Sequence, residues 1–484
     1  MSISQSGTNS SGFLSKVEQR GIEPVPNDQR TGGPGSLFWL WLAANISIMG
    51  IPVGVTLVAL GLNFYQCVAA AAIGGVGSMA LVAVVSFAGV TGAAPTLALS
   101  RRAFGNRGNI APTFISLISQ LGWETVSTVT ATYALLSLCS YFFGTSVNPA
   151  DNIPLTIFFI LAFMLVTVAI SATGHSFMMV MEKWATWTVG ALTLAVLIYL
   201  VTTVHDQTAS FISQEPGSTA AFIVGISTVA AGTGLGWLTC GADMSRYQKP
   251  GSKLRGVLTW TAVGGGIPLI IVITIGAMLS AGDSALTAAS DPIEGVRAAL
   301  PVWVAVPYLI AAVGGIIMGN SVSVYSCGLN TITMGLRVPR PATVVVDVTI
   351  TTLASAYFLL GSDGFYGPFI SFISLAAVPL CCWAGVFIVD WAHRHDYDAE
   401  AMLDLSSKSK YYFWKGIQPI GTVSWLIAMA IAFLFVNAQI SETVTWFAGP
   451  LSTSWIGENG MAWALGMLIA MLLTEIGHRI SSKA

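Results

Sequence analysis

The chain has 484 residues, of which 54% are hydrophobic and 9% charged, with a formal net charge of −2 at pH 7 and a mean hydropathy of +0.75. Soluble domains carry roughly 25% charged residues, so this composition excludes a water-soluble globular protein and predicts an all-α integral membrane protein. No basic patch points to nucleic acid as a partner. All six cysteines lie inside apolar segments, which is typical of small buried side chains and not of a disulfide framework.

Twelve apolar segments are long enough to cross a hydrocarbon core, which takes about 20 helical residues. A polar N-terminus without an apolar signal core predicts a cytoplasmic tail at residues 1–35. Five spans then occupy residues 36–204 and five more occupy 219–390, followed by a cytoplasmic loop with two last spans at 391–474 and a tail at 475–484. The expected spans are Leu37–Gly61, Gln66–Val90, Pro112–Phe143, Pro154–Ala172, Ala185–Val204, Ala220–Ala242, Gly256–Ala281, Val302–Met334, Thr343–Leu360, Tyr366–Val389, Ile417–Val436 and Ser454–Thr474.

The distribution of basic residues agrees with this topology. Twelve crossings place both termini in the cytoplasm, and 19 of the 20 Lys and Arg residues then lie inside, with only Arg297 in an external loop. Because positive charge is enriched in cytoplasmic loops, the asymmetry predicts a plasma membrane protein (an inner membrane protein in a bacterium) with both ends inside.

The first and sixth spans both contain helix-breaking residues. In the first, Asn45 and Ser47 precede Pro52, and a proline inside a helix removes a backbone hydrogen bond. The sixth has three glycines in five residues, each costing about 1 kcal/mol relative to alanine in a helix interior: Gly232, Gly234 and Gly236. Ordinary kinks are one interpretation. Interrupted helices five spans apart are also what an inverted repeat produces, with a solute site at the two breaks.

The third span places polar and aromatic side chains on one helical face. Gln120, Trp123, Glu124 and Ser127 follow the i, i+3, i+4, i+7 spacing. An ionised carboxylate in hydrocarbon is expensive, so Glu124 is expected to face the interior, as a proton-coupling or ligand-orienting group or as a structural carboxylate. Trp123 lies near the middle of its span, where the interfacial-belt explanation fails. With Trp237 it could hold a planar aromatic solute by stacking, core packing being the alternative.

The eighth span carries Asn320 amid serines. Its amide offers a donor and an acceptor, suited to the edge of an amide-like heterocycle, and helix–helix hydrogen bonding is the alternative. Two other membrane carboxylates are interpreted as structural: Asp243 as a pair or gate with Arg246, and Asp347 as an ion pair with Arg340.

Enzyme signatures are absent from the sequence. There is no phosphate-binding glycine loop with a lysine, no HExxH motif and no paired His and Asp in a span. We therefore expect no enzyme and no cofactor. Without an ATP-binding domain, transport would draw on an ion gradient or run downhill.

At these residues the chain resembles the nucleobase–cation symport-1 family, and within it the purine–cytosine permease branch. The resemblance extends from about Gly21 to Asp390 and rests on the order and spacing of its motifs, which are GIEPVPNDQRT, FWLWLAANI, LSRRAFGNRGN, GWLTCGADMSRY and the region of Asn320. It implies a LeuT-like fold with ten core helices in two inverted repeats, two additional C-terminal helices, and alternating access.

The resemblance also implies roles for individual residues. Trp123 would stack on the substrate, Asn320 would recognise the base, and the other implied contacts are Ser47, Ser127, Thr233 and Gly234, with Trp237 close by. Sodium-coupled members place two hydroxyl side chains where this chain has Gly314 and Gly315. Backbone carbonyls near Ala43 and Ile46 remain as possible cation ligands. Because the hydroxyl oxygens of a sodium site are missing, we expect a proton as the co-transported ion, with Glu124 and the neighbouring Gln120 as candidate coupling residues.

The sequence therefore predicts a secondary active transporter that imports a nucleobase, cytosine or a purine, with a proton favoured over sodium. One alternative is a transporter of another planar heterocycle, such as allantoin, a hydantoin, pyridoxine or thiamine. A second is a channel or nutrient receptor without coupled transport, and an intramembrane enzyme is the weakest. The oligomeric state does not follow from the sequence.

Overall fold

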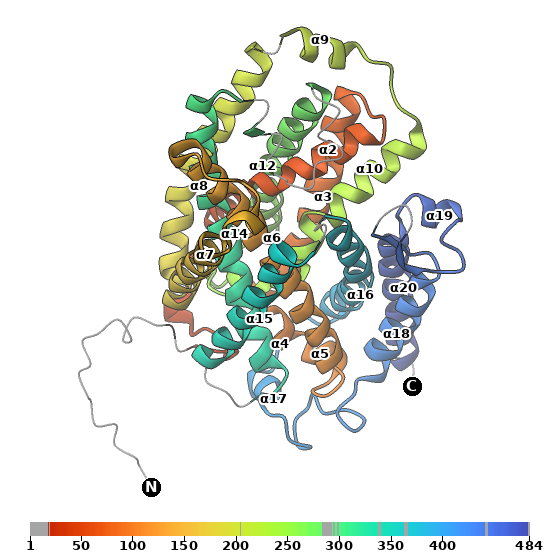
Figure 1. Ribbon diagram of the computed structural model, residues 1–484. Helices are drawn as coiled ribbons and strands as arrows, with labels where there is room; N and C mark the ends of the chain where they lie inside the picture. The colour runs from red at the N-terminus through yellow and green to blue at the C-terminus, as the bar shows by residue number, and fades with distance from the viewer. Residues whose placement is uncertain are drawn as a thin grey trace, which may run out of the picture.

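The computed structural model describes residues 18, 20–203, 205–282, 293, 296–297, 300–336, 340–362, 366–440 and 444–482. Most of the predicted N-terminal tail, with Lys16, therefore lies outside the described residues, as do Arg337 and Lys483. The described chain is mostly helical, and its helices pack into one bundle at varied tilts (Figure 1).

Long helices account for most of the chain, with short 3₁₀ turns (η) at the interruptions. In order, the elements are η2 Asn27–Gln29, α1 Gly35–Asn45, η3 Ile48–Gly50, α2 Ile51–Ala59, α3 Phe64–Gly92, α4 Thr96–Leu99, α5 Arg101–Phe104, α6 Ile110–Phe143, η4 Pro149–Asn152, α7 Ile153–Thr173, α8 His175–Thr203, α9 His205–Ser213, α10 Thr219–Ala231, η5 Gly234–Cys240, α11 Gly241–Ser245, α12 Leu254–Gly282, α14 Val302–Thr333, α15 Arg340–Leu360, α16 Tyr366–His393, α17 Ala399–Leu403, α18 Pro419–Phe433, β1 Asn437–Gln439, β2 Thr445–Ala448, α19 Trp455–Glu458 and α20 Ala462–Ser481.

Each of the twelve expected spans overlaps a helix, but the count of twelve crossings is not confirmed. Among the described residues, ten helices are long and apolar enough to cross a membrane, or eleven if the bent pair α1 and α2 forms one span. The remaining segment, α18, has only 15 residues, because the chain leaves the helix after Phe433 and enters the antiparallel pair β1 and β2.

The first span is broken, as predicted, but upstream of its proline. α1 ends at Asn45, Ser47 is extended, and the helix resumes with an overall bend of 64°. Pro52 occupies one of the first two positions of α2, where its missing N–H costs no intrahelical hydrogen bond. The break therefore exposes the backbone around Ile46 and Ser47 instead of the turn before the proline.

The sixth span is interrupted in a different way. α10 ends at Ala231, Thr233 adopts a non-helical backbone (φ −138°, ψ −102°), and the chain continues as the 3₁₀ segment η5 before α11. Two glycines of this stretch serve close packing: a Cβ on Gly234 would lie 2.3 Å from Ser78 Oγ of α3, and one on Gly236 would lie 2.6 Å from Trp123 Nε1 of α6. Glycine is required there because any side chain would collide.

The helices form two groups that face each other across the site. One contains the broken helices, with α1, α2, α10, η5 and α11 packed on α3 and α12. The other contains α6, α7, α8, α14 and α15, in which α14 packs on α6, α7, α8 and α15. The last helices α18 and α20 pack together beside α16, at the edge of the molecule (Figure 1). Interruptions on one side thus lie opposite continuous helices on the other.

Candidate substrate site

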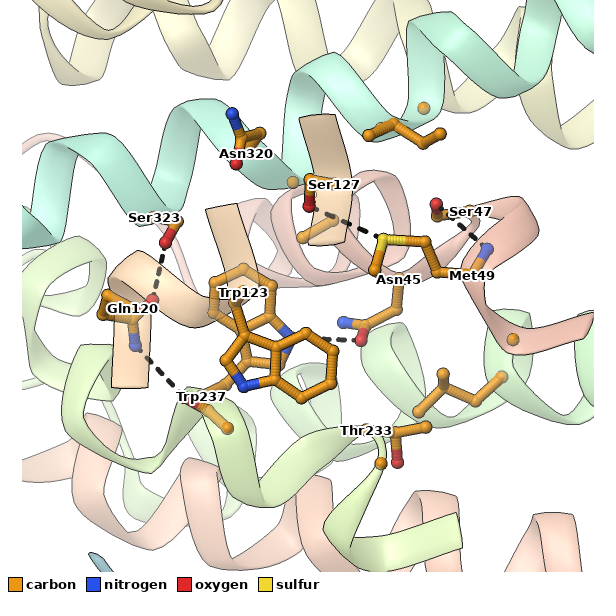
Figure 2. Close-up of a pocket in the computed structure, with 18 residues that line it drawn as sticks. Asn45, Ser47, Met49, Gln120, Trp123, Ser127, Thr233, Trp237, Asn320 and Ser323 are labelled. Carbon is orange, nitrogen blue, oxygen red and sulfur yellow. Dashed lines mark hydrogen bonds between the residues drawn. The ribbon is translucent and has the colours of Figure 1, made fainter. Parts of the chain in front are cut away.

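A cavity lies where the two breaks meet α6 and α14. Its volume is about 70 Å³, on a measure by which one water needs roughly 10–15 Å³, so it admits a molecule of several water volumes. The residues that line it come from α1, η3, the α10–η5 break, α6, α12 and α14 (Figure 2). The lining residues are Ala44, Asn45, Ser47, Met49, Gly50, Gln120, Trp123, Ser127, Gly232, Thr233, Gly236, Trp237, Leu269, Gly315, Ile316, Gly319, Asn320 and Ser323.

Trp123 is held in place by two neighbours. Its indole meets the ring of Phe369 on α16 edge to face, with centroids 5.2 Å apart and planes at 84°. On another side it lies against the backbone of Gly236, where even a methyl group would not fit. Because these contacts restrict the rotamer, the indole is a pre-positioned flat surface in the cavity wall.

Trp237 joins the two broken helices. Its Nε1 donates a hydrogen bond to Asn45 Oδ1 at 3.3 Å, and its ring packs edge-on to Trp41 of α1 with centroids 5.7 Å apart. Asn45 in turn donates from Nδ2 to the carbonyl of Trp41 at 2.9 Å. The indole N–H is therefore already satisfied, and Trp237 contributes its ring to the cavity wall.

Asn320 is the most exceptional polar group of the cavity. Its side chain is 2% exposed, and neither its Oδ1 nor its Nδ2 has a hydrogen-bond partner among the described residues. A buried amide without partners costs about 1–3 kcal/mol, and almost all buried polar groups in proteins are satisfied. An amide that lines a cavity and keeps both a donor and an acceptor unused has the properties of a ligand-binding group.

A hydrogen-bond chain connects α14 with the sixth-helix break. Ser323 Oγ lies 2.7 Å from Gln120 Oε1, and Gln120 Nε2 donates to the carbonyl of Gly236 at 3.2 Å (Figure 2). Ser323 Oγ is also 3.1 Å from Oε1 of Glu124, which is fully buried behind the cavity wall. A serine hydroxyl has one hydrogen to donate, so these two acceptors compete for it.

The structure brings most of the predicted site residues together. Those in the lining are Ser47, Gln120, Trp123, Ser127, Thr233, Trp237 and Asn320. Gly234 is not among the lining residues, because it faces Ser78 of α3. Glu124 also lies outside the lining and is connected to it by the hydrogen bond with Ser323. Whether the lining residues contact a substrate stays a prediction.

Several lining residues were not predicted as site residues. Ser323 lies three residues after Asn320, so helical spacing alone could have placed it on the same face. Asn45 was noticeable as a polar residue in an apolar span, next to the break. Met49, whose Sδ accepts a hydrogen bond from Ser127 Oγ at 3.5 Å, gives no signal in the sequence.

The region predicted for a residual cation site consists of backbone. A Cβ on Gly315 would lie 2.9 Å from the carbonyl oxygen of Ile46, so α14 packs directly on the chain that leaves α1. Gly314 is the second glycine at which the resemblance would place a hydroxyl in a sodium-coupled member. A Cβ added to it would lie 3.9 Å from Val189, the nearest atom. A hard cation prefers six or more oxygen ligands, or several with water, and no side-chain hydroxyl is present at either glycine. Neither Ala43 nor Ile46 lines the cavity.

The ion pair predicted between Asp243 and Arg246 is not formed among the described residues, whereas the one predicted between Asp347 and Arg340 falls on a side chain outside them and stays a prediction. Asp243 accepts a hydrogen bond from the backbone N–H of Thr96 at 2.8 Å, where it caps α4, and it forms no ion pair with Arg246 among the described residues. Asp347 lies beside Glu124, with carboxyl oxygens within 4.8 Å of each other. Asp347 lies on a face of α15 that packs against α6.

Arg246 binds a segment from the N-terminal part of the chain. Its guanidinium lies 3.7 Å from Glu18 Oε1 and donates to Tyr325 Oη at 2.8 Å. The hydroxyl of Tyr247 donates to the same Glu18 oxygen at 2.6 Å, and burial raises the pKa of Tyr247 above its usual range, which keeps it a neutral donor. This cluster connects the N-terminal segment to α14 and to the chain that follows α11.

Solved structures share this architecture. Mhp1, described as a nucleobase-cation-symport-1 family transporter, in a closed conformation with bromovinylhydantoin bound, matches with a TM-score of 0.76 at 18% identity, over 96% of this chain and 95% of that one. A Na⁺-coupled sialic acid symporter matches with a TM-score of 0.59 at 11% identity, over 97% and 95% of the two chains. The predicted LeuT-like fold is thereby confirmed, and the chain is an integral membrane protein.

The family follows from the sequence match. The model of the permeases for cytosine/purines, uracil, thiamine and allantoin matches residues 24–456, so the chain belongs to this family. The putative purine-cytosine permease YxlA of Bacillus subtilis is 26% identical over 467 residues, which cover 95% of each chain. These relatives are permeases, so the chain is a transporter and not an enzyme.

Proposed function

We propose that the protein imports a nucleobase, cytosine or a purine, by symport with a proton and by alternating access. The flat base would lie on the indole of Trp123, and its donor and acceptor edge would pair with the amide of Asn320. The substrate would enter from outside, and both termini would be cytoplasmic, as the distribution of Lys and Arg favours.

The observation that carries this proposal is the Asn320 amide, buried in the cavity wall with both polar atoms unpaired. A substrate that supplied one acceptor and one donor on the same edge would satisfy both. Nucleobases present such an edge next to a flat ring. The similarity to a putative purine-cytosine permease over 95% of both chains supports the same class of substrate.

A proton is favoured over sodium by the groups near the first-helix break. Sodium would need oxygen ligands, and the chain has Gly314 and Gly315 where sodium-coupled members have hydroxyls. In addition, α14 packs directly on the backbone at this place, since a Cβ on Gly315 would lie 2.9 Å from the Ile46 carbonyl oxygen, and this packing leaves no room for a side-chain ligand there. A buried carboxyl group, Glu124, is one hydrogen bond away from the cavity and could carry a proton.

Uptake into proteoliposomes tests the proposal. Labelled cytosine, adenine and hypoxanthine would each be offered under an imposed inward proton gradient, an inward sodium gradient or no gradient. We expect accumulation of at least one base with the proton gradient alone, abolished by a proton ionophore. Accumulation that requires sodium would refute proton coupling. Uptake that ignores both ions would indicate a channel or uncoupled carrier.

A second candidate is another planar heterocycle. The family description includes thiamine and allantoin, and Mhp1 has a hydantoin bound. Competition by unlabelled allantoin, hydantoin, pyridoxine and thiamine against labelled cytosine separates the two candidates. Stronger competition by one of these than by unlabelled bases would favour the second.

A further inference from the structure

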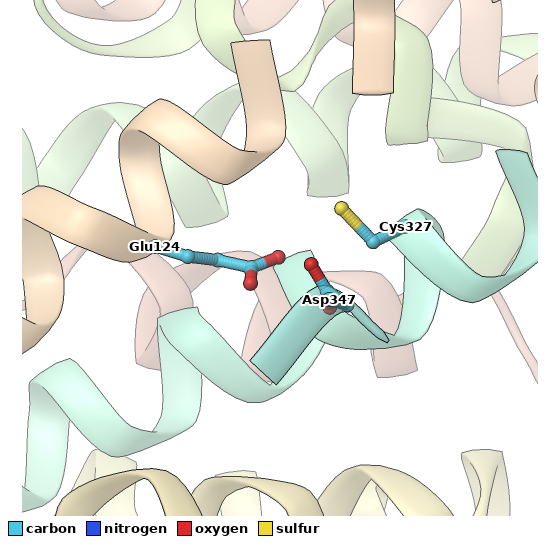
Figure 3. A group of neighbouring side chains, drawn as sticks. All are labelled: Glu124, Cys327 and Asp347. Carbon is cyan, nitrogen blue, oxygen red and sulfur yellow. The ribbon is translucent and has the colours of Figure 1, made fainter. Parts of the chain in front are cut away.

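Two carboxyl groups and a thiol meet in the interior of the helix group that contains α6, α14 and α15. Glu124 of α6, Cys327 of α14 and Asp347 of α15 have side-chain ligand atoms within 4.8 Å of one another, and all three are buried. Figure 3 shows the Glu124 carboxyl directed toward that of Asp347, with Cys327 beside them. This cluster lies outside the cavity lining described above.

The two carboxyl groups differ in their hydrogen bonding. Glu124 faces the hydroxyls of Ser323 at 3.1 Å and Thr351 at 3.3 Å, one on each oxygen. Asp347 is 5% exposed, and neither of its oxygens has a hydrogen-bond partner in the described part of the chain. Asp347 is thus a buried carboxyl group that has no hydrogen-bond donor and lies next to a second carboxyl group. A single proton bound to one of the two groups would form a hydrogen bond to the other and remove one negative charge.

Among the residues that the structure describes, the surroundings of the pair offer no compensating positive charge. The neighbouring titratable groups are the thiols of Cys327 on α14 and Cys240 on η5, while α7 carries none, Asp151 of η4 is exposed and bonded to Ser146, and Asp390 of α16 is bound to Arg102. No Lys, Arg or His side chain in the described residues forms an ion pair with Glu124 or Asp347. Two ionised carboxylates this close in a dry interior repel each other strongly.

We propose that Glu124 and Asp347 form the binding site of the co-transported proton, and that Ser323 transmits its occupancy to the substrate cavity. The inference deepens the proposed proton symport and rests on it. The proton adds to a carboxylate oxygen of the pair and is shared between the two groups. Asp347 thereby becomes part of the coupling machinery.

The transmission follows from the single hydrogen of Ser323. When the pair is empty, the Glu124 carboxylate attracts this hydrogen, since charge-assisted hydrogen bonds are the stronger ones. When the pair holds a proton, Ser323 donates instead to Gln120 Oε1, 2.7 Å away. Gln120 is then fixed with its Nε2 on the Gly236 carbonyl, which orders the sixth-helix break beneath Trp123. Proton binding therefore prepares the cavity for the substrate.

Two variants and a matched control test this site in proteoliposomes with labelled cytosine and adenine. Glu124→Gln and Asp347→Asn each remove one carboxyl, and Glu182→Gln makes the same change at a buried carboxyl of α8 that is also without hydrogen-bond partners. We expect both pair variants to lose gradient-driven accumulation, at least tenfold, while exchange of labelled for unlabelled base across the membrane continues. The control should accumulate base like the wild type.

The pH dependence of binding gives a second readout. In the wild type, base affinity should rise as the pH falls, whereas Glu124→Gln should bind equally well across the pH range. Ser323→Ala leaves both carboxyls in place and should flatten the same profile, so it tests the relay even if a pair variant does not fold. Wild-type accumulation and pH profile in Glu124→Gln or Asp347→Asn would overturn the inference, as would dependence on a divalent ion removed by a chelator. If the inference is overturned in this way but the wild type still shows proton-driven uptake, the proposed function stands. If the wild type shows no proton-driven uptake, the proposed function itself is refuted.

Discussion

Replacing Gly236 by alanine tests whether the position of Trp123 determines substrate affinity. The new Cβ would lie 2.6 Å from Trp123 Nε1 and 3.0 Å from Cε2, whereas ordinary contacts begin near 3.4 Å, so the indole must retreat by about 0.8 Å. It cannot do so freely, because Phe369 packs on it edge to face. Overpacking of this kind costs typically 1–3 kcal/mol in stability.

The expected effect on binding follows from the stacking contact. A well-placed aromatic pair contributes about 0.5–1.5 kcal/mol beyond its buried area, so losing that contact weakens binding by about 2- to 12-fold. Equilibrium binding of labelled cytosine and adenine to the purified variant in detergent measures this change, and gel filtration confirms that the variant is folded.

Gly314→Ala is the matched control. It is the same substitution, made in α14, but the nearest atom to its new Cβ is 3.9 Å away, on Val189. We expect wild-type affinity for the control. Wild-type affinity in folded Gly236→Ala would show that the observed packing of Trp123 on the sixth-helix break has no role in binding.

Three other substitutions address different parts of the site. Trp123→Ala should abolish uptake while surface expression, measured by labelling of intact cells, stays normal; unchanged uptake would eliminate Trp123 as the stacking surface. Asn320→Ala should weaken base binding by about 5- to 150-fold, because two hydrogen bonds worth about 0.5–1.5 kcal/mol each are lost, and titration calorimetry would reveal an unaffected affinity if the amide is only structural. Glu18→Ala removes charge-assisted hydrogen bonds from Tyr247 and Tyr325, worth about 1.5–3 kcal/mol each. Its melting temperature in detergent should fall, and an unchanged value would mean that this N-terminal contact does not stabilise the bundle.

Much of the fold could be predicted from local patterns. Long apolar segments and the distribution of Lys and Arg indicate spans and their order, because burial in lipid imposes its requirements residue by residue. The same holds for the two interrupted helices, since Gly and Pro affect the backbone where they stand. The exact break did not follow: the chain leaves the helix at Ile46 and Ser47, before Pro52, because a proline is accommodated in the first turn of the next helix.

The candidate site was predictable where one helix face contains it. Trp123, Ser127 and Gln120 share a face of α6, and Asn320 lies on the opposing α14, so periodicity placed these side chains correctly in the cavity lining. Gly234 could not be distinguished from Gly236 in the same way. Which of them faces the cavity depends on what packs against the 3₁₀ turn, Ser78 of α3 for one and Trp123 for the other.

Partnerships between distant helices were decided only by the tertiary structure. The sequence suggested local partners for Asp243 and Asp347, each a few residues away, because sequence separation is the only distance it records. In the folded chain Asp243 caps α4, and Asp347 meets Glu124 across the interface of α15 and α6. A carboxyl group takes the partner that helix packing brings within a few ångströms, and that choice is made by surfaces that lie far apart in the sequence. The residue types and their helical faces were determined by the sequence, and the pairs they form were determined by packing.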